Sequence, residues 1–143
     1  MALHLHHTEK HMNNVTCLLI DNDEEDQEIF SMAMHDVNSN MLCVFAVNGV
    51  AAMKLLNSDV SFVPSIIFMD INMPLMDGAD CLREIKKIER LQQIPVYIYS
   101  TTADPQSLAR VKQLGSHEVI IKPTTFTNLK ETLARLLASH NAL

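Results

Sequence analysis

Residues 66–78 read IIFMDINMPLMDG, and this stretch indicates what kind of sheet the chain forms. The apolar run over residues 65–69 is typical of a strand that is buried on both faces of a sheet. Asp70 follows where the run ends, and Pro74 and Gly78 then predict a turn before a helix begins. Open α/β sheets bind ligands at the carboxyl ends of such strands, so Asp70 is the first candidate functional residue. The alternative at this point is that its carboxylate only caps the turn.

A short apolar run followed by helical spacing recurs along the chain. Predicted strands occupy residues 15–20, 41–47, 65–69, 96–99 and 119–121. Apolar residues at helical spacing follow them, within residues 29–37, 50–56, 81–88, 108–114 and 126–137. Pro105 suits the first turn of the fourth helix, and Gly115 suits its C-terminal cap. Strands that alternate with helices predict an α/β fold, a five-stranded parallel sheet with five helices covering both faces.

The composition is that of one domain. The chain has 143 residues, of which 48% are hydrophobic, enough to bury a core. We expect residues 15–143 to form this domain, and residues 1–14, with His4, His6, His7 and His11, to be a mobile tail or the remnant of an expression tag. A net charge of −6 argues against binding to nucleic acid or to an anionic membrane.

The expected location is the cytoplasm. No apolar run reaches the length needed to span a bilayer, and no apolar leader precedes the first strand. The three cysteines lie within apolar patterns and lack the spacing of a metal site, so we expect reduced thiols.

Polar side chains follow four of the predicted strands at their carboxyl ends. They are Asp21 and Asn22 after the first strand, Asp70 after the third, Ser100 after the fourth and Lys122 after the fifth. In a parallel sheet these ends share one edge, so the side chains are expected to converge. Clustered carboxylates repel unless a cation joins them, and a few oxygen ligands suit Mg²⁺. A lysine and a hydroxyl can hold phosphoryl oxygens. The pattern therefore predicts phosphoryl transfer to a carboxylate, with Asp70 as the acceptor.

Four motifs, in this order, resemble a known family. LLIDND, MDINMPLMDG, YSTTAD and IIKP are together similar to the receiver domain of two-component response regulators, of the stand-alone chemotaxis-regulator type. The resemblance covers nearly everything after residue 14. It implies a flavodoxin-like, doubly wound sheet with strand order 2-1-3-4-5. It also implies Mg²⁺ as the cofactor, with a metal site formed by Asp21, Asn22, Asp70 and the main-chain carbonyl of Asn72.

The resemblance also implies roles for the other motif residues. Asp70 matches the phosphorylated aspartate, Ser100 the conformational switch position, and Lys122 the lysine that pairs with the acceptor and then with its phosphate. Gly78 matches a turn glycine. Pro123 matches a proline whose preceding peptide bond is often cis in the family.

Two positions depart from the family pattern. Asn22 stands where the family has a second acid, so we expect weaker Mg²⁺ binding than in a site with three carboxylates. Asp23 is next to it, but alternation along a strand points its side chain elsewhere. Glu24, Glu25 and Asp26 lie in the first turn of a helix, where the helix dipole is a sufficient structural reason for acidic residues. Val119 stands where the family usually has Tyr or Phe, and a valine cannot make the ring movement that accompanies switching.

The function expected from this resemblance is that of a single-domain response regulator. A histidine kinase or a histidine phosphotransfer protein would donate the phosphoryl group, and the chain would assist its own phosphorylation and dephosphorylation without turning over a separate substrate. We expect a monomer or weak dimer that acts by protein contact through its fourth helix, fifth strand and fifth helix, because no output domain follows residue 143.

Three other functions share parts of this pattern. A degenerate receiver would bind partners without phosphorylation, as Asn22 and Val119 allow. A phosphohydrolase with an aspartyl-phosphate intermediate would need a second acid where Asn72 stands. A flavodoxin would need a phosphate-binding first loop, and the acids around Asp21 would repel a phosphate.

Overall fold

The computed structural model describes residues 15–102 and 104–140, so the expectation for residues 1–14 lies outside the described residues. Five parallel strands form one sheet in the order β2-β1-β3-β4-β5. Their bounds are β1 Val15–Ile20, β2 Met41–Ala46, β3 Ile66–Met69, β4 Val96–Ser100 and β5 Glu118–Ile121. The α/β class, the five strands and their order are as predicted. Strand β2 ends one residue early because its pairing with β1 stops at Ile20 and Ala46.

The helices follow the strands in turn. They are α2 Glu24–Val37, α3 Gly49–Ser58, α4 Gly78–Lys86, α5 Pro105–Gln113 and α6 Phe126–Ala138, with a short 3₁₀ helix, η1 Glu89–Leu91, after α4. Each α-helix begins after a residue whose side chain accepts a hydrogen bond from a main-chain N–H of the first turn; these residues are Asp23, Asn48, Asp77, Asp104 and Thr125. Helix α4 starts three residues before the predicted range, because Asp77 supplies this cap.

The C-terminal cap predicted for α5 is present. Gly115 has φ of 100°, and Ser116 N–H donates to Val111 O at 2.9 Å while Gly115 N–H donates to Lys112 O at 3.2 Å. This pair of bonds is the Schellman arrangement, which needs a residue in the left-handed region. It turns the chain directly from α5 into β5.

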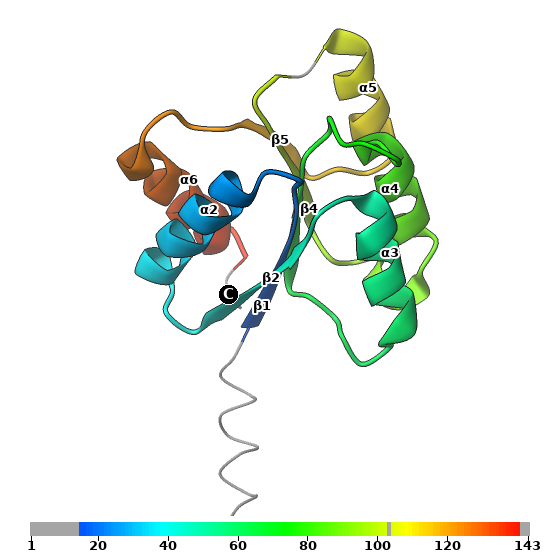
Figure 1. Ribbon diagram of the computed structural model, residues 1–143, viewed down its shortest axis with the longest axis horizontal. Coiled ribbons are helices and arrows are strands. Elements are labelled where there is room, and N and C mark those ends of the chain that lie inside the picture. Colours follow the sequence, from blue (N-terminus) through cyan, green and yellow to red (C-terminus); the bar gives the residue numbers. More distant parts are fainter. Residues whose placement is uncertain (1–14, 103, 141–143) are drawn as a thin grey trace, which may run out of the picture.

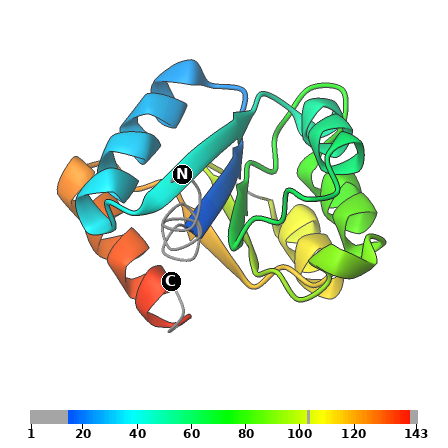
Figure 2. The same cartoon turned by 90° about the horizontal axis from the view of Figure 1, so that it is seen from below.

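The sheet separates two helical layers. Figures 1 and 2 show α2 and α6 on one face and α3, α4 and α5 on the other. Strand β3 supplies side chains to both cores: Ile66 and Phe68 pack toward α2 and α6, whereas Ile67 and Met69 pack toward the three helices opposite. All four side chains are fully buried, which explains the uninterrupted apolar run of this strand. Asp70 is therefore carried by the most enclosed strand of the molecule.

The described helices include none that is both long enough and apolar enough to cross a membrane. Cys17, Cys43 and Cys81 all carry free thiols.

Candidate functional site

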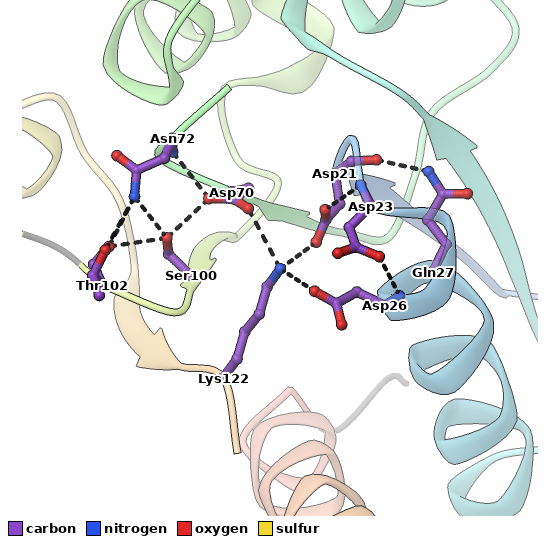
Figure 3. Close-up of polar contacts among 9 residues, drawn as sticks. All are labelled: Asp21, Asp23, Asp26, Gln27, Asp70, Asn72, Ser100, Thr102 and Lys122. Carbon is purple, nitrogen blue, oxygen red and sulfur yellow. Dashed lines mark hydrogen bonds and ion pairs between the residues drawn. The ribbon is translucent and has the colours of Figure 1, made fainter. Parts of the chain in front are cut away.

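Four strand ends bring their polar residues together at the carboxyl edge of the sheet. Asp21 follows β1, Asp70 follows β3, Ser100 ends β4 and Lys122 follows β5. Figure 3 shows these side chains turned toward one another. The convergence arises because parallel strands in register end at the same edge.

The Asp70 carboxylate uses its two oxygens differently. Oδ1 accepts hydrogen bonds from Ser100 Oγ and from Asn72 N–H, each at 2.9 Å. Oδ2 faces Lys122 Nζ at a longer 3.4 Å. The residue as a whole is only 8% exposed. Oδ1 is thus held in place, and Oδ2 is the oxygen that remains more available to an incoming group.

Lys122 lies between three carboxylates. Its Nζ is 2.7 Å from Asp21 Oδ2, 2.7 Å from Asp26 Oδ2 and 3.4 Å from Asp70 Oδ2. Burial opposes the charged form of the lysine, but the hydrogen bonds that it donates to Asp21 and Asp26 outweigh burial and hold its pKa well above the usual range. One ammonium therefore faces three carboxylates, and the cluster keeps an excess of negative charge.

Asp21 is the most buried member of the cluster, with no exposed side-chain surface. Burial raises its pKa, while the hydrogen bond from Lys122 acts in the opposite direction. Its Oδ1 accepts from Asp23 N–H at 2.9 Å, and its main-chain carbonyl accepts from Gln27 Nε2 at 2.6 Å. These contacts tie the loop between β1 and α2 to the pocket.

The Ser100 hydroxyl has two competing acceptors. It lies 2.9 Å from Asp70 Oδ1 and 3.0 Å from the carbonyl of Thr102, and its single proton can serve only one of them at a time. The side chain of Asn72 braces the same loop by donating to Thr102 O at 3.1 Å. The site therefore contains a hydroxyl poised between the acceptor carboxylate and the loop after β4.

The structure gives different positions than expected to two residues near the start of α2, Asn22 in the β1–α2 loop and Asp26 in the first turn of the helix. Asn22 is exposed, and within residues 15–102 and 104–140 its side chain has no hydrogen bond to the other predicted site residues. Asp26, assigned from sequence to the helix dipole alone, instead binds Lys122. Asp23 caps α2, so its carboxylate is engaged away from the lysine, as alternation predicted. Among neighbouring acids, no sequence feature singled out Asp26 as the one facing the pocket.

Gly78 packs closely against the main chain at Asp70 and Ile71, so this position has no room for a side chain. A side chain at this position would place its Cβ 2.7 Å from Ile71 Cα and 2.9 Å from Asp70 O. The turn glycine of the motif thus lets α4 approach the carboxyl end of β3. The peptide bond before Pro123 is trans, because the described residues contain no cis bond. Val119 is partly buried against the core beside α5.

The donor chemistry of the pocket fits a hard divalent cation. The available ligands are carboxylate, amide and carbonyl oxygens, and the cluster has surplus negative charge. In the part of the chain that the structure describes, no group of three or more His, Cys, Asp or Glu side chains is spaced to hold a metal ion by itself. An ion here would therefore need main-chain oxygens, water or a phosphoryl group to complete its shell, which is how Mg²⁺ is usually bound.

Comparison with known proteins agrees with this geometry. Residues 17–134 match the family described as the response regulator receiver domain. Chemotaxis protein CheY-3 of Vibrio cholerae is 30% identical over 124 residues, which cover 86% of this chain and 92% of that protein. The chain spans half or less of the length of three other curated relatives that it matches.

Two solved structures have the same fold. The phosphorylated cyanobacterial phytochrome response regulator RcpA has a TM-score of 0.78 at 23% identity, with 86% of this chain and 91% of that chain covered. The Mn²⁺-bound form of response regulator Rcp1 has a TM-score of 0.76 at 22% identity, with 87% and 92% covered.

The fold and the acidic pocket define a receiver of the flavodoxin-like class. The match over residues 17–134 then makes the identification specific: the chain belongs to the receiver domain family of response regulators. Members of this family act in two-component systems, with a histidine kinase as the general kind of partner, and are not turnover enzymes.

Proposed function

We propose that the chain is a single-domain, cytoplasmic response regulator that accepts a phosphoryl group on Asp70 from a phosphohistidine donor, with Mg²⁺ as cofactor. The observation that carries this proposal is the arrangement around Asp70. One carboxylate oxygen is fixed by Ser100 and Asn72, and the other lies near the Lys122 ammonium with less restraint. A positioned nucleophile flanked by a cation and a hydroxyl is what phosphoryl transfer to a carboxylate needs.

In the proposed reaction, Asp70 Oδ2 attacks the phosphorus of the donor. The new P–O bond forms as the P–N bond breaks, and the imidazole leaves with the electron pair and takes up a proton. Lys122 is close enough to Oδ2 to pair with the transferred group, at the expense of its contacts with Asp21 and Asp26. When bound by Asp21, Asn22, Asp70 and the Asn72 carbonyl, Mg²⁺ would neutralise charge on the phosphoryl oxygens.

Phosphorylation would be relayed through Ser100. A phosphoryl oxygen on Asp70 is a strong acceptor and would draw the hydroxyl away from the Thr102 carbonyl. The loop after β4 would then lose a restraint, and the change would reach α5. We propose the surface of α5, β5 and α6 as the output face, since a groove of about 530 Å³ between α5 and β5 lies beside Val119.

The test is intact-mass measurement after incubation with acetyl phosphate or a phosphorylated kinase and Mg²⁺. Wild-type protein should gain the mass of one phosphoryl group, and Asp70→Asn should gain none. Asp59→Asn is the matched control, because Asp59 is an exposed cap at the C-terminal end of α3. The proposal fails if wild type gains no mass, or if Asp70→Asn gains as much.

A phosphorylation-independent binding module is the second candidate. It is favoured by the exposed Asn22 and by Val119, which stands where the family usually has Tyr or Phe. That function would be supported if a captured partner bound wild type and Asp70→Asn with equal affinity, with and without the phosphoryl donor.

A further inference from the structure

Two cysteines lie side by side on neighbouring strands of the sheet. Cys17 of β1 and Cys43 of β2 are register partners in the parallel pairing. Both side chains belong to the core on the α2 and α6 side of the sheet, so they point the same way. Neighbouring strands are about 4.8 Å apart, which lies within the roughly 4.4–6.8 Å that separates the Cα atoms of a disulfide.

The two thiols are in contact and are not equivalent. Cys17 and Cys43 interact with each other, and Ser31 of α2 lies beside Cys43. Cys43 is partly exposed on the edge strand, whereas Cys17 has no exposed surface. The hydrogen bond from Cys17, reinforced by Ser31, lowers the pKa of Cys43, while burial raises the pKa of Cys17. This is the arrangement of an accessible attacking sulfur with a buried resolving thiol beside it.

The third cysteine lacks all of these features. Cys81 lies within α4, on the opposite face of the sheet, and is fully buried. Burial raises the pKa of its thiol to about 12. The chain therefore contains its own unreactive reference thiol.

We propose that Cys17 and Cys43 form a redox-sensitive dithiol, which a peroxide converts into a reversible disulfide between β1 and β2. The Cys43 thiolate attacks one peroxide oxygen, the O–O bond breaks, and with one proton taken up the products are a Cys43 sulfenic acid and water. The Cys17 sulfur then attacks the Cys43 sulfur and displaces a second water. Together the two thiols lose two electrons and two protons, and hydrogen peroxide becomes two waters.

The disulfide would join the edge strand β2 to its neighbour in the sheet, β1. A bond that is partly exposed on an edge strand is accessible to a small thiol such as glutathione, which can reduce it. The dithiol gives the chain an oxidant-dependent state that needs no phosphoryl group.

The experiment counts thiols in the whole folded chain. Reduced protein is exposed to hydrogen peroxide, then denatured in an alkylating reagent, and its peptides are mapped by mass spectrometry. The alkylated thiols should fall from three to one, the remaining one being Cys81, with a linked peptide pair that contains Cys17 and Cys43. Dithiothreitol should restore all three.

Variants test the order of the steps. Cys43→Ser should keep both remaining thiols at the same peroxide dose, and Cys81→Ala should still form the bond. Cys17→Ala should stop at a Cys43 sulfenic acid that dimedone traps. The proposal is overturned if wild type keeps three alkylated thiols, if Cys81 oxidises as fast as Cys43, or if oxidation links only separate molecules. The wild-type peptide map decides the matter even if a variant fails to fold.

Discussion

At the scale of single residues, Lys122 balances the charge of the pocket. Its ammonium is the cation that faces Asp21, Asp26 and Asp70, and its side chain is only 8% exposed. A buried charge left without its partner is costly, so the lysine contributes to folding as well as to the proposed reaction.

Lys122→Ala should lower the free energy of unfolding at pH 7 by about 3 kcal/mol, because three carboxylates lose their counter-charge. Burial already raises the pKa of Asp21, and without the lysine it rises further. The folded variant then binds protons that the unfolded chain does not. The difference in free energy of unfolding between wild type and variant should therefore shrink as the pH falls through the folded pKa of Asp21.

Urea denaturation across this pH range measures both effects. Lys54→Ala, at an exposed position of α3, is the control and should change stability by less than about 0.5 kcal/mol. A Lys122→Ala protein as stable as wild type at pH 7 would show that the acidic cluster does not depend on the lysine.

At the scale of elements, the start of α4 fits closely against the end of β3. Gly78 and Gly49 are the first residues of α4 and α3, and both lack space for a side chain. A Cβ at Gly78 would meet main-chain atoms of Asp70 and Ile71, whereas one at Gly49 would meet the flexible side chain of Met76.

Gly78→Ala should therefore destabilise the protein by about 2 kcal/mol, since main chain must shift to make room. Gly49→Ala should cost clearly less, because the Met76 side chain can move to another rotamer. Chemical denaturation of the two variants side by side checks the difference. Equal losses would mean that the approach of α4 to β3 is not closely packed.

The end of α6 is joined to the start of β4 by a polar contact. His140 Nε2 lies 2.5 Å from the hydroxyl of Tyr97, and the ring of His117 lies nearby, tilted by 59° with its centroid 5.1 Å from that of His140. Burial, with a smaller effect of His117, lowers the pKa of His140 below its usual value. Burial and the neighbouring His117 therefore favour a neutral His140.

A histidine with a lowered folded pKa contributes stability that is present above its unfolded pKa of about 6.5 and is lost as the pH falls through the folded pKa. Stability should decline as the pH falls from about 7.5 through this range, and His140→Gln should show less of this decline. The exposed His35, replaced by Gln, is the control. Urea denaturation at several pH values measures the slopes, and identical slopes in wild type and His140→Gln would contradict the prediction.

At the scale of the whole molecule, a bound cation should stabilise the fold. A ligand that binds only the folded state adds about 2.7 kcal/mol at a hundredfold excess over its Kd. Mg²⁺ should therefore raise the thermal midpoint of the wild type. Asn22→Asp adds a carboxylate beside the pocket. It should tighten Mg²⁺ binding about fivefold, because the attraction of the added charge contributes about 1 kcal/mol in water.

Calorimetric titration with Mg²⁺ measures the affinity directly. Asn57→Asp adds the same charge at an exposed site on α3 and should leave the affinity unchanged. If Asn22→Asp binds Mg²⁺ no more tightly than Asn57→Asp, then position 22 does not take part in the metal site.

The sheet was predictable from sequence because each buried strand is a continuous apolar run, and Asp21, Asp70, Ser100 and Lys122 were found by their positions at strand ends. The strand order came from the family resemblance, since periodicity does not order parallel strands. The placement of Asp26 was not predictable, because five acids crowd the β1–α2 connection and only the packing of α2 sets which one faces Lys122. The brace from Asn72 to Thr102 likewise joins two loops that have no periodic pattern.

Because β3 is covered by helices on both of its faces, a donor can reach Asp70 only along the strand axis, from the open carboxyl edge. A phosphohistidine recessed in a cleft would stop short of a carboxylate that is 8% exposed. Under the proposed function, the donor would therefore carry its histidine on a protruding, convex surface, whereas a molecule as small as acetyl phosphate would be subject to no such steric selection.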